Sequence, residues 1–371
     1  MELKKYRFDE VTINFDKRRV PLSGAQRERR PGKYRYYGAQ GIIDHIDDFI
    51  FDGTYLLIAE DGENLKSKKQ NIAQVVDGQF WVNNHAHVVQ GNELCDTRYL
   101  CYLLNSMDLS GYITGSAQPK LSQANLNAVT MFLPSIDEQK KIIEYLYTLD
   151  KKIVVNQRIN DNLLAQAQTL YKQFFPYSVQ DDLPDGWRIG TVGEIIEIHD
   201  SKRIPLSGAD RAKMEKKIYP YYGAASLMDF VDNYIFDGKY LLLGEDGTVV
   251  DDAGYPILQY VWGQFWVNNH AHILTGRLGY DVESLYMLFK QTPVKSIVTG
   301  AVQPKISQAN LRSIQVVIPP EYNLREYNDL VEPLFSLFRA NEEECKTLTA
   351  LRDTLLPKLM SGEIDVSAVQ L

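Results

Sequence analysis

Two histidines separated by one residue lie in each half of the chain, inside an identical decapeptide. The sequence GQFWVNNHAH occupies residues 78–87 and occurs again at residues 263–272. Because alternate side chains of a β-strand point to the same face, a strand here would place His85 and His87 side by side. Together with a Glu-Asp-Gly sequence they could bind zinc or iron, as in a duplicated metal-dependent hydrolase. The candidate ligands are His85, His87, Glu60 and Asp61 in the first half, and His270, His272, Glu245 and Asp246 in the second.

A framework role for the decapeptide is the competing interpretation. Neither copy has a third histidine at a matching position, because His45 and His199 do not correspond between the halves. Imidazoles that form hydrogen bonds inside a domain core need no third ligand. We therefore favour a framework strand, with Trp81 and Asn83 on the face of the two histidines, and expect no metal site.

The decapeptide belongs to a duplication that covers nearly the whole chain. RRVPLSGA matches KRIPLSGA, IFDGTYLLIAEDG matches IFDGKYLLLGEDG, and TGSAQPKLSQANL matches TGAVQPKISQANL. Arg19 aligns with Arg203, and the second copy gains a single position before Tyr36 aligns with Tyr221. Each copy takes up half of the chain, far more than a solenoid repeat, so we expect two copies of a domain with its linker, related by approximate twofold symmetry.

Each copy begins with a region of mixed secondary structure. Up to Pro134 and Pro319, short segments rich in β-branched and aromatic residues alternate with Gly and Asp turns, which predicts strands. YLLIAEDG indicates a buried strand that ends in a turn. Short helices are predicted at residues 94–105 and 284–289. The fold class is therefore α+β, with two similar mixed domains.

After each of these prolines the apolar period changes to the heptad spacing of a coiled coil. Two long antiparallel helices that pack on each other are predicted, and the first is roughly 48 Å long at ~1.5 Å per residue. The predicted contact positions, called seam positions below, are Ile142, Leu146, Leu149, Ile153, Asn156, Asn160, Leu163, Ala167, Leu170 and Phe174 in the first helix, and Val331, Leu334, Phe338, Asn341, Cys345, Leu348 and Leu355 in the second.

Several residues disturb this apolar pattern, and four of them bear on the helix prediction. Asn156 and Asn341 occupy equivalent seam positions, where a buried polar residue lowers stability but can set the register when it finds a polar partner. The alternative is that both amides face solvent at a frayed contact. Arg352 interrupts the second seam. Pro333 removes a backbone hydrogen bond, so the second helix is expected to begin or kink there.

Length and composition indicate a globular protein. The chain has 371 residues, of which 44% are hydrophobic, enough for two or three domains with cores. It contains no apolar run long enough to span a bilayer, and MELKKYRFDE lacks the apolar segment of a signal peptide. We therefore expect a cytoplasmic protein with no membrane partner. Three cysteines without paired spacing suggest reduced thiols.

The net charge of −8 argues mildly against nucleic-acid binding, but the basic residues are clustered. Such clusters either contact phosphates or form a solvated face. The clustered residues, our candidates for DNA binding, are Lys17, Arg18, Arg19, Arg27, Arg29, Arg30, Lys33, Arg35, Lys66, Lys68 and Lys69 in the first half, and Lys202, Arg203, Arg211, Lys213, Lys216 and Lys217 in the second.

The chain resembles the specificity subunit of Type I restriction-modification systems. The resemblance rests on the duplication combined with TGSAQPKLSQANL and LPSIDEQKKIIEYL at the end of the first domain and LRDTLLPKLMSGEI near the C-terminus. It covers essentially the whole chain. The second domain also opens with LPDGW, as is common in this family, whereas the first domain lacks that sequence and its first strand is left undefined.

The resemblance implies a subunit with no catalytic residues and no bound cofactor. Each domain would be a target recognition domain that reads one half of a split double-stranded DNA sequence. The helices, at 135–175 and 320–362, would set the spacing and dock two methyltransferase subunits that use S-adenosylmethionine, and a motor nuclease subunit can join. The implied division is recognition domains at 1–134 and 181–319, with helical spacers at 135–180 and 320–371.

DNA contacts are expected where the two copies differ. The divergent segments are QRERRPGKYR against DRAKMEKKIYP, and ENLKSKKQNIAQVVD against TVVDDAGYPILQYVW. Arginine can bind guanine edges, Gln and Asn can bind adenine, and lysine anchors phosphates; the alternative is an exposed loop. For Lys120 and Lys305 in the QPK sequences we favour a turn that joins domain to helix. A hydrolase and a coiled-coil scaffold that binds no DNA remain the alternatives.

Overall fold

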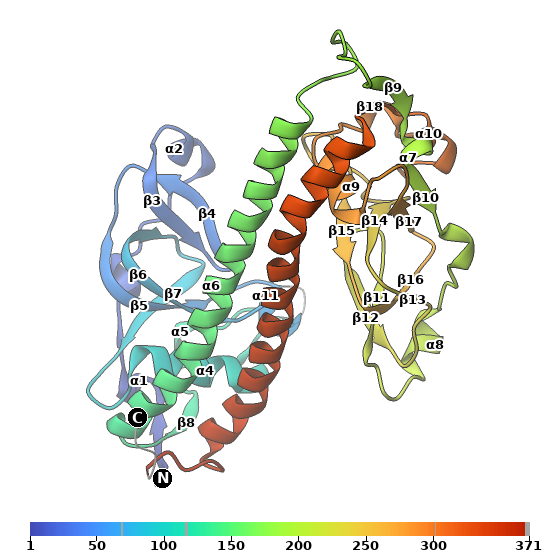
Figure 1. Ribbon diagram of the computed structural model, residues 1–371. Coiled ribbons are helices and arrows are strands. Elements are labelled where there is room, and N and C mark those ends of the chain that lie inside the picture. The colour runs from blue at the N-terminus through green and yellow to red at the C-terminus, as the bar shows by residue number, and fades with distance from the viewer. Residues whose placement is uncertain (68–69, 116–117, 301, 368–371) are drawn as a thin grey trace. The chain divides into compact units, whose positions relative to one another are not determined.

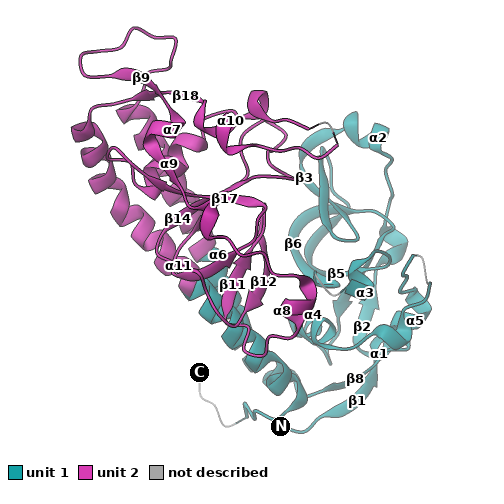
Figure 2. Ribbon diagram, turned by 90° about the vertical axis from the view of Figure 1, so that its right-hand side faces the viewer, with its two compact units in different colours: residues 1–155, 344–371 teal, residues 156–343 magenta. Residues whose placement is uncertain are grey.

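The structure divides into two compact units that correspond to the two copies of the repeat. The computed structural model describes residues 1–67, 70–115, 118–300 and 302–367. Unit 1 comprises residues 1–155 and 344–371, and unit 2 comprises residues 156–343 (Figure 2). Each unit therefore contains one mixed domain and a segment of each long helix.

The domain of unit 1 contains short strands and short helices (Figure 1). Its strands are β1 (Lys4–Arg7), β2 (Thr12–Asn14), β3 (Pro31–Gly38), β4 (Gly41–Ile46), β5 (Phe51–Ala59), β6 (Ala73–Val82), β7 (Ala86–Gly91) and β8 (Thr130–Leu133). Its helices are α1 (Phe8–Val11), η1 (Asp16–Arg18), α2 (Gly24–Glu28), α3 (Asn64–Ser67), α4 (Thr97–Ser106), η2 (Ser110–Tyr112) and α5 (Gln123–Asn127). The helix predicted at 94–105 is confirmed as α4.

The domain of unit 2 has a similar element order, although its described residues form no helix equivalent to α3. Its strands are β9 (Arg188–Thr191), β10 (Ile196–Ile198), β11 (Tyr219–Tyr222), β12 (Leu227–Val231), β13 (Phe236–Asp237), β14 (Tyr240–Gly244), β15 (Leu258–Val261), β16 (Gln264–Val267), β17 (Ala271–Gly276) and β18 (Gln315–Ile318). Its helices are α7 (Val192–Ile195), η3 (Asp200–Lys202), α8 (Gly208–Ala212), α9 (Val282–Phe289), η4 (Lys295–Ile297) and α10 (Gln308–Arg312). The predicted mixed fold is confirmed in both units.

The main sheets have the same strand order. In unit 1 six strands run in the order β2-β7-β5-β6-β3-β4. Unit 2 has two four-stranded sheets, β10-β17-β14-β15 and β12-β11-β16-β13, because each of the two long central strands is split in two. The splits fall at Gly238 and Gly263, whose positive φ angles of 129° and 77° match those of Gly53 (128°) and Gly78 (84°) in unit 1. Glycine adopts such angles without the steric cost of a Cβ atom, so these glycines bend the central strands of both domains.

The decapeptide is not one strand, and this part of the sequence prediction was wrong. β6 ends at Val82 and β7 begins at Ala86, so His85 lies in the turn between them and only His87 lies on a strand. The reason is tertiary, because β6 and β7 pair with opposite edges of β5 and the chain must leave one edge to reach the other.

A short antiparallel pair closes each domain near the start of its long helix. β9, which follows LPDGW, pairs with β18, and β1 pairs with β8 in the same way. The first domain therefore has an equivalent first strand although it lacks the LPDGW sequence.

The two long helices predicted from the heptad spacing are α6 (Ile136–Phe174) and α11 (Glu321–Ser361) (Figure 1). At the start of α6, Ser135 and Glu138 form reciprocal capping hydrogen bonds. Within unit 2 the helix segments are antiparallel, because Asn160 contacts Asn341 while the later residue Ala167 contacts the earlier residue Tyr327. Every predicted seam position is buried or partly buried.

Pro333 does not begin the second helix, which already starts at Glu321. Leu324 and Tyr327, which precede the proline, and Val331 and Phe335, which flank it, are all fully buried or nearly so. The apolar contacts therefore continue through the proline, and their burial outweighs the loss of one backbone hydrogen bond.

Arg352, which interrupts the second seam, has a partner within unit 1. Its Nη1 atom donates to Oδ1 of Asp150 at 2.8 Å, and a second nitrogen donates to Asp353. The charge is thus paired across the two helix segments of this unit.

The partner of Asn341 is Asn160, a residue that the seam contains but that we did not single out. Nδ2 of Asn341 donates to Oδ1 of Asn160 at 2.9 Å, and Nδ2 of Asn160 donates to Oε1 of Glu342 at 2.8 Å. Both amides are buried, and Asn156 is fully buried as well. The alternative of solvent-facing amides is therefore wrong, whereas a role in setting the register stays a prediction.

Replacing Asn160 with Leu is expected to lower the free energy of unfolding by about 1–3 kcal/mol, since the buried Asn341 amide loses its acceptor. The double variant Asn160→Leu, Asn341→Leu should recover most of this loss because no amide is then left unpaired. Guanidinium unfolding of the three proteins measures the difference, and equal stability of the single and double variants would contradict the pairing.

Candidate nucleic-acid interface

Four sequence blocks shared by the two copies meet in one charged group in each domain. Each block contains one short sequence that both copies share: Arg-X-Pro-Leu-Ser, Glu-Asp-Gly, His-Ala-His or Gln-Pro-Lys. We call the group the framework cluster; it consists of Asp16, Arg19, Glu60, His87 and Lys120 in unit 1, and of Asp200, Arg203, Glu245, His272 and Lys305 in unit 2.

The arginine of each cluster connects the two carboxylates. Arg203 lies 2.6 Å from Glu245 and 3.4 Å from Asp200, and it also donates to the carbonyl oxygen of Ala271 on β17. In unit 1, Arg19 makes the same contacts with Glu60 at 2.9 Å and with Asp16 at 3.3 Å. These arginines therefore hold the segment before α2 or α8 against the sheet.

The buried histidine of each cluster uses both ring nitrogens. In unit 2, Nδ1 of His272 lies 2.6 Å from Oδ2 of Asp200, and Nε2 donates to the carbonyl oxygen of Ile306 at 2.8 Å. Unit 1 has the same arrangement for His87 with Asp16 and Leu121, at 2.6 and 2.9 Å. Both ring nitrogens of each histidine therefore face oxygen atoms inside the domain, and the imidazole connects the segment before α2 or α8 to the segment after the Gln-Pro-Lys sequence.

The pKa values of the cluster carboxyls are lowered. Burial by itself raises the pKa of Asp16 and of Asp200, but hydrogen bonds and charge from the neighbouring histidine, a backbone N–H and the arginine outweigh it. Burial also raises the pKa of Glu60 and of Glu245. The neighbouring arginine, histidine and lysine lower it by more, so the pKa of each glutamate falls below its ordinary value. All four groups therefore favour the ionised form.

Stability should fall when the protein is acidified below about pH 4.5. A carboxyl whose pKa is lower in the folded state contributes stability above its unfolded pKa, here 3.8 for Asp and 4.5 for Glu, and loses it as the pH falls through the folded value. Urea midpoints measured between about pH 6 and pH 3 should show this decline. The double variant Asp16→Asn, Asp200→Asn should show a shallower decline, and an identical pH profile would contradict the assignment.

The proposed metal site is not supported. Oxygen and nitrogen atoms of Asp200, Glu245 and His272 do lie within 4.8 Å of one another, as metal ligands would. However, Arg203 and Lys305 already supply positive charge to these carboxylates, at 2.6 Å and 3.2 Å from Glu245. A metal ion would have to displace these cations, so the cluster fits a framework role.

The other two candidate ligands of each copy form a separate pair. His270 contacts Asp246, and His85 lies 2.7 Å from Asp61, with about half of each imidazole side chain exposed. The four proposed ligands of each half thus form two separate pairs. The glutamate and the second histidine belong to the framework cluster, whereas the aspartate and the first histidine form a more exposed pair. This separation follows from the turn that interrupts the decapeptide.

Many of the predicted DNA-binding cations bond to groups of their own unit. Segment 23–38 is not a loop but forms α2 and β3, whereas in the equivalent segment residues 213–218 form an irregular connection between α8 and β11. The bonded cations and their partners are Arg18 with Ile50 O, Arg27 with Asp44, Arg30 with Asp47, Arg35 with Asp77 O, Arg211 with Asp229, and Lys217 with Asp229. These bonds, like those of Arg19 and Arg203, stabilise the domain itself.

Other predicted cations are exposed to solvent. In unit 1 these are Lys17, Arg29, Lys33 and Lys66, and in unit 2 they are Lys202, Lys213 and Lys216. Lys66 lies on α3, and Lys68 and Lys69 lie outside the described residues. Lys120 and Lys305 are about half exposed and bond to the framework glutamates. The expectation that their motif joins the domain to the long helix was wrong, because α5 and β8 follow it in unit 1, and α10 and β18 in unit 2, before the long helix begins.

Each domain also has an exposed apolar pair on an edge strand, and we did not foresee it. Ile42 and Ile43 on the edge strand β4 are 49% and 51% exposed, and their counterparts Leu227 and Met228 on β12 are 44% and 54% exposed. An edge strand has unpaired backbone groups, so exposed apolar side chains on it form a candidate contact surface. The signal in the sequence was that Ile-Ile in the first copy aligns with Leu-Met in the second.

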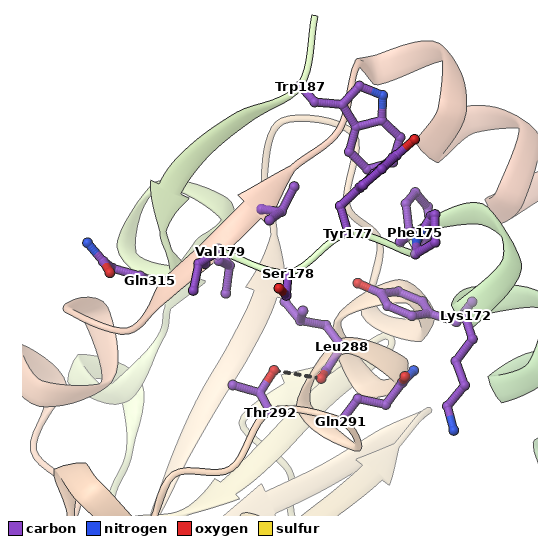
Figure 3. A pocket seen from close by; sticks show the side chains of 14 residues that line it. Lys172, Phe175, Tyr177, Ser178, Val179, Trp187, Leu288, Gln291, Thr292 and Gln315 are labelled. Carbon is purple, nitrogen blue, oxygen red and sulfur yellow. Dashed lines mark hydrogen bonds between the residues drawn. The ribbon is translucent and has the colours of Figure 1, made fainter. Parts of the chain in front are cut away.

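A cavity of about 330 Å³ in unit 2 lies where the chain leaves α6 and enters β9 (Figure 3). Phe175, Tyr177 and Trp187 line it, and the rings of Tyr177 and Trp187 meet edge to face with centroids 5.0 Å apart. The tryptophan of LPDGW therefore packs the linker against its own domain. The cavity contains none of the framework residues.

Comparison with known proteins agrees with the resemblance found in the sequence. Residues 2–165 and 184–349 match the family described as Type I restriction modification DNA specificity domain. The chain is 24% identical over 306 residues to the MjaIX specificity subunit of Methanocaldococcus jannaschii, covering 73% of this chain and 69% of the relative. It is also 24% identical over 342 residues to a putative Type I restriction enzyme specificity subunit of Haemophilus influenzae, covering 88% and 85%.

A solved structure shows the same fold. The S subunit of a Type I restriction-modification system from M. genitalium aligns with a TM-score of 0.61 and 18% identity, covering 97% of this chain and 96% of that chain. Among the residues that the structure describes, no helix combines the length and apolarity needed to cross a bilayer. Neither the hydrolase nor the scaffold alternative is supported. The chain belongs to the family of Type I restriction modification DNA specificity proteins, and its role is in DNA sequence specificity.

Proposed function

We propose that this chain is the non-catalytic specificity subunit of a Type I restriction-modification complex, in which each domain reads one half of a split DNA sequence. The observation that carries this proposal is the pairing of a common framework with divergent surfaces. The framework cluster is the same in both units, whereas the surface segments next to it differ. Two scaffolds of one design with different surfaces suit the reading of two half-sites.

The reading surface of each domain is the segment that carries the exposed cations and the apolar pair. In unit 1 this is residues 23–46, and in unit 2 it is residues 207–231. Arg29 and Lys33 anchor phosphates, and Ile42 and Ile43 contact base edges such as the methyl group of thymine. Because Arg27 and Arg30 are held by Asp44 and Asp47, they fix the shape of this surface.

The helices α6 and α11 set the distance between the half-sites and dock two methyltransferase subunits. These partners bind S-adenosylmethionine and methylate adenine, and a motor nuclease subunit can join the complex. Such a complex acts in the cytoplasm, where it meets chromosomal DNA. The exposed faces of the helices, opposite the buried seam positions, are available for these contacts.

The test is a genome-wide map of methylated adenine in cells that express this chain with its methyltransferase partner. A split motif, two short sequences separated by a constant gap, is the expected result. A methylation pattern without any split motif would rule out the proposal. Catalytically inactive methyltransferase with the same chain is the control.

Exchange of the reading surfaces tests which residues are responsible. A chain in which residues 23–46 are replaced by residues 207–231 should read the same half-site with both domains, so one half of the motif changes and the gap does not. A motif that stays unchanged would locate the reading surface elsewhere. Lys213→Ala with Lys216→Ala should weaken DNA binding for all sequences and lower its salt dependence, since these lysines anchor phosphates.

A further inference from the structure

Unit 1 contains a cavity of about 480 Å³ between β6, α4 and the segments of α6 and α11 that belong to this unit. Val75 of β6, Cys101 of α4 and Leu356 of α11 line it with apolar or thiol groups. Arg98 and Arg352 line it with guanidinium groups. Ligand pockets begin at roughly 300 Å³, so this space, which is open to solvent on one side, has the size of a binding site.

Unit 2 fills the equivalent space with its own side chains. The residues of unit 2 that align with Val75, Cys101 and Asp150 in the repeat are Tyr260, Tyr286 and Phe335, respectively. The Tyr260 ring lies 5.3 Å from Phe335 and is stacked on Tyr286 at 6.0 Å between centroids. The strand register is the same in both domains, with Val75 opposite Leu56 and Tyr260 opposite Leu241, so the three rings of unit 2 stand at positions whose counterparts line or adjoin the cavity in unit 1.

The three differences in side-chain size between the units fall on three different elements. β6 and β15, α4 and α9, and the helix segments each contribute one of the three positions, and all three carry a ring in unit 2 and a smaller side chain in unit 1. Loss of a single ring would leave a defect that costs stability. Three smaller side chains at one place, with charged groups around them, leave room for an aromatic group.

The charges around the cavity indicate what kind of aromatic group fits. Three carboxylates, Asp77, Asp150 and Asp353, line it together with the guanidinium groups of Arg98 and Arg352, so the lining carries one net negative charge. Burial raises the pKa of the Cys101 thiol to about 12, so this group adds no charge. A ligand with a hydrogen-bond donor or a positive charge complements such a lining.

The ion pairs leave the carboxylates able to accept further hydrogen bonds. Arg98 donates to Asp77 at 3.0 Å, Arg352 donates to Asp150 at 2.8 Å, and the hydroxyl of Tyr102 donates to the other oxygen of Asp150. A carboxylate offers about four acceptor positions, so each retains capacity for a ligand donor.

We propose that this cavity binds a planar aromatic group that carries a hydrogen-bond donor or a positive charge, and that unit 2 has closed its equivalent site with tyrosine and phenylalanine rings. The group is either a free aromatic amine or phenol, or the aromatic side chain of a partner subunit. That a partner subunit supplies the aromatic side chain rests on the proposed function, whereas the existence of the binding site does not.

Tyramine, which carries a positive charge, and p-cresol, which is a neutral phenol of similar shape, are suitable probes. Titrated into the purified full-length chain, tyramine should bind with a dissociation constant on the order of 1 mM, as expected for a ligand of this size. The variant Val75→Tyr, Cys101→Tyr, which installs the rings of unit 2, should bind at least ~10-fold more weakly because the space is filled. Lack of tyramine binding by the natural chain, or equal binding by this variant, would overturn the proposal.

A second variant keeps the test informative if the filled variant does not fold. Asp353 is exposed, and Asp353→Asn removes one charge from the lining without changing its shape. Tyramine binding should weaken several-fold while p-cresol binding stays unchanged, and equal effects on both probes would contradict the charge argument.

The source of the ligand is distinguished by assembly. If the filled variant loses affinity for the methyltransferase subunit, the cavity accepts a side chain of that partner; if assembly is unchanged, it accepts a free molecule. Probe binding needs neither DNA nor a partner, so its failure would remove this site and leave the proposed function intact.

Discussion

Asp200→Ala is expected to destabilise unit 2 by about 3–5 kcal/mol, because it removes one member of a buried charged network and leaves the others unpaired. Asp200 is 7% exposed and accepts hydrogen bonds from the ring of His272, the N–H of Ile273 and the amide of Gln308. Without it these donors stay buried with no acceptor, and the segment before α8 loses its anchor. Hydrogen exchange at the Ile273 amide, together with urea unfolding, measures the effect.

Two variants make this test specific. Asp232→Ala removes an exposed carboxylate of the same domain and should change stability by no more than about 0.5 kcal/mol. Asp200→Asn keeps one acceptor oxygen, so its free energy of unfolding should lie between those of Asp200→Ala and Asp232→Ala. Equal stability of Asp200→Ala and Asp232→Ala would show that the framework cluster does not hold the domain together.

Leu163→Glu is expected to disrupt the helix pairing in unit 2. Leu163 is 7% exposed and lies on α6 between Asn160 and Ala167, both of which contact α11. A carboxylate there would be buried without a partner and the leucine contacts would be lost, a combined cost of about 3–5 kcal/mol or more. Unfolding by urea should begin at lower concentration, and the methyltransferase subunit should no longer copurify.

The neighbouring position supplies the control. Asn162 is exposed on the same helix, so Asn162→Glu adds the same charge without placing it in the seam. It should leave both stability and copurification unchanged. If Leu163→Glu bound the partner as well as Asn162→Glu does, the assignment of these helices as the docking element would be wrong.

Local patterns in the sequence were reliable where short-range backbone geometry decides the structure. The heptad spacing from Ile142 to Phe174 predicted α6, and the repeat predicted two similar domains, whose main sheets have the same strand order in the structure. An apolar period depends only on the turn of a helix or the pleat of a strand. The expectation that the second helix begins at Pro333 was wrong because a local cost was weighed without the buried residues on both sides of the proline.

Long-range pairing could not be predicted in the same way. The decapeptide looked like one strand, but the pairing of β6 and β7 with opposite edges of β5 placed a turn at His85. The basic clusters looked like a DNA surface, but Asp44 and Asp47, on or just after the next strand, lie within hydrogen-bond distance of Arg27 and Arg30. A cation is available to phosphate only if the fold leaves it without such a partner.

By itself the sequence determined the duplication, the helices, the family and the existence of a common framework. Only the tertiary structure decided that Asp16, Arg19, Glu60, His87 and Lys120 form one cluster, although they lie far apart along the chain. It also revealed the cavity in unit 1, which no single copy of the repeat indicates. The physical reason is that periodicity is a property of neighbouring residues, whereas a charged cluster or a cavity depends on which distant side chains the fold brings together.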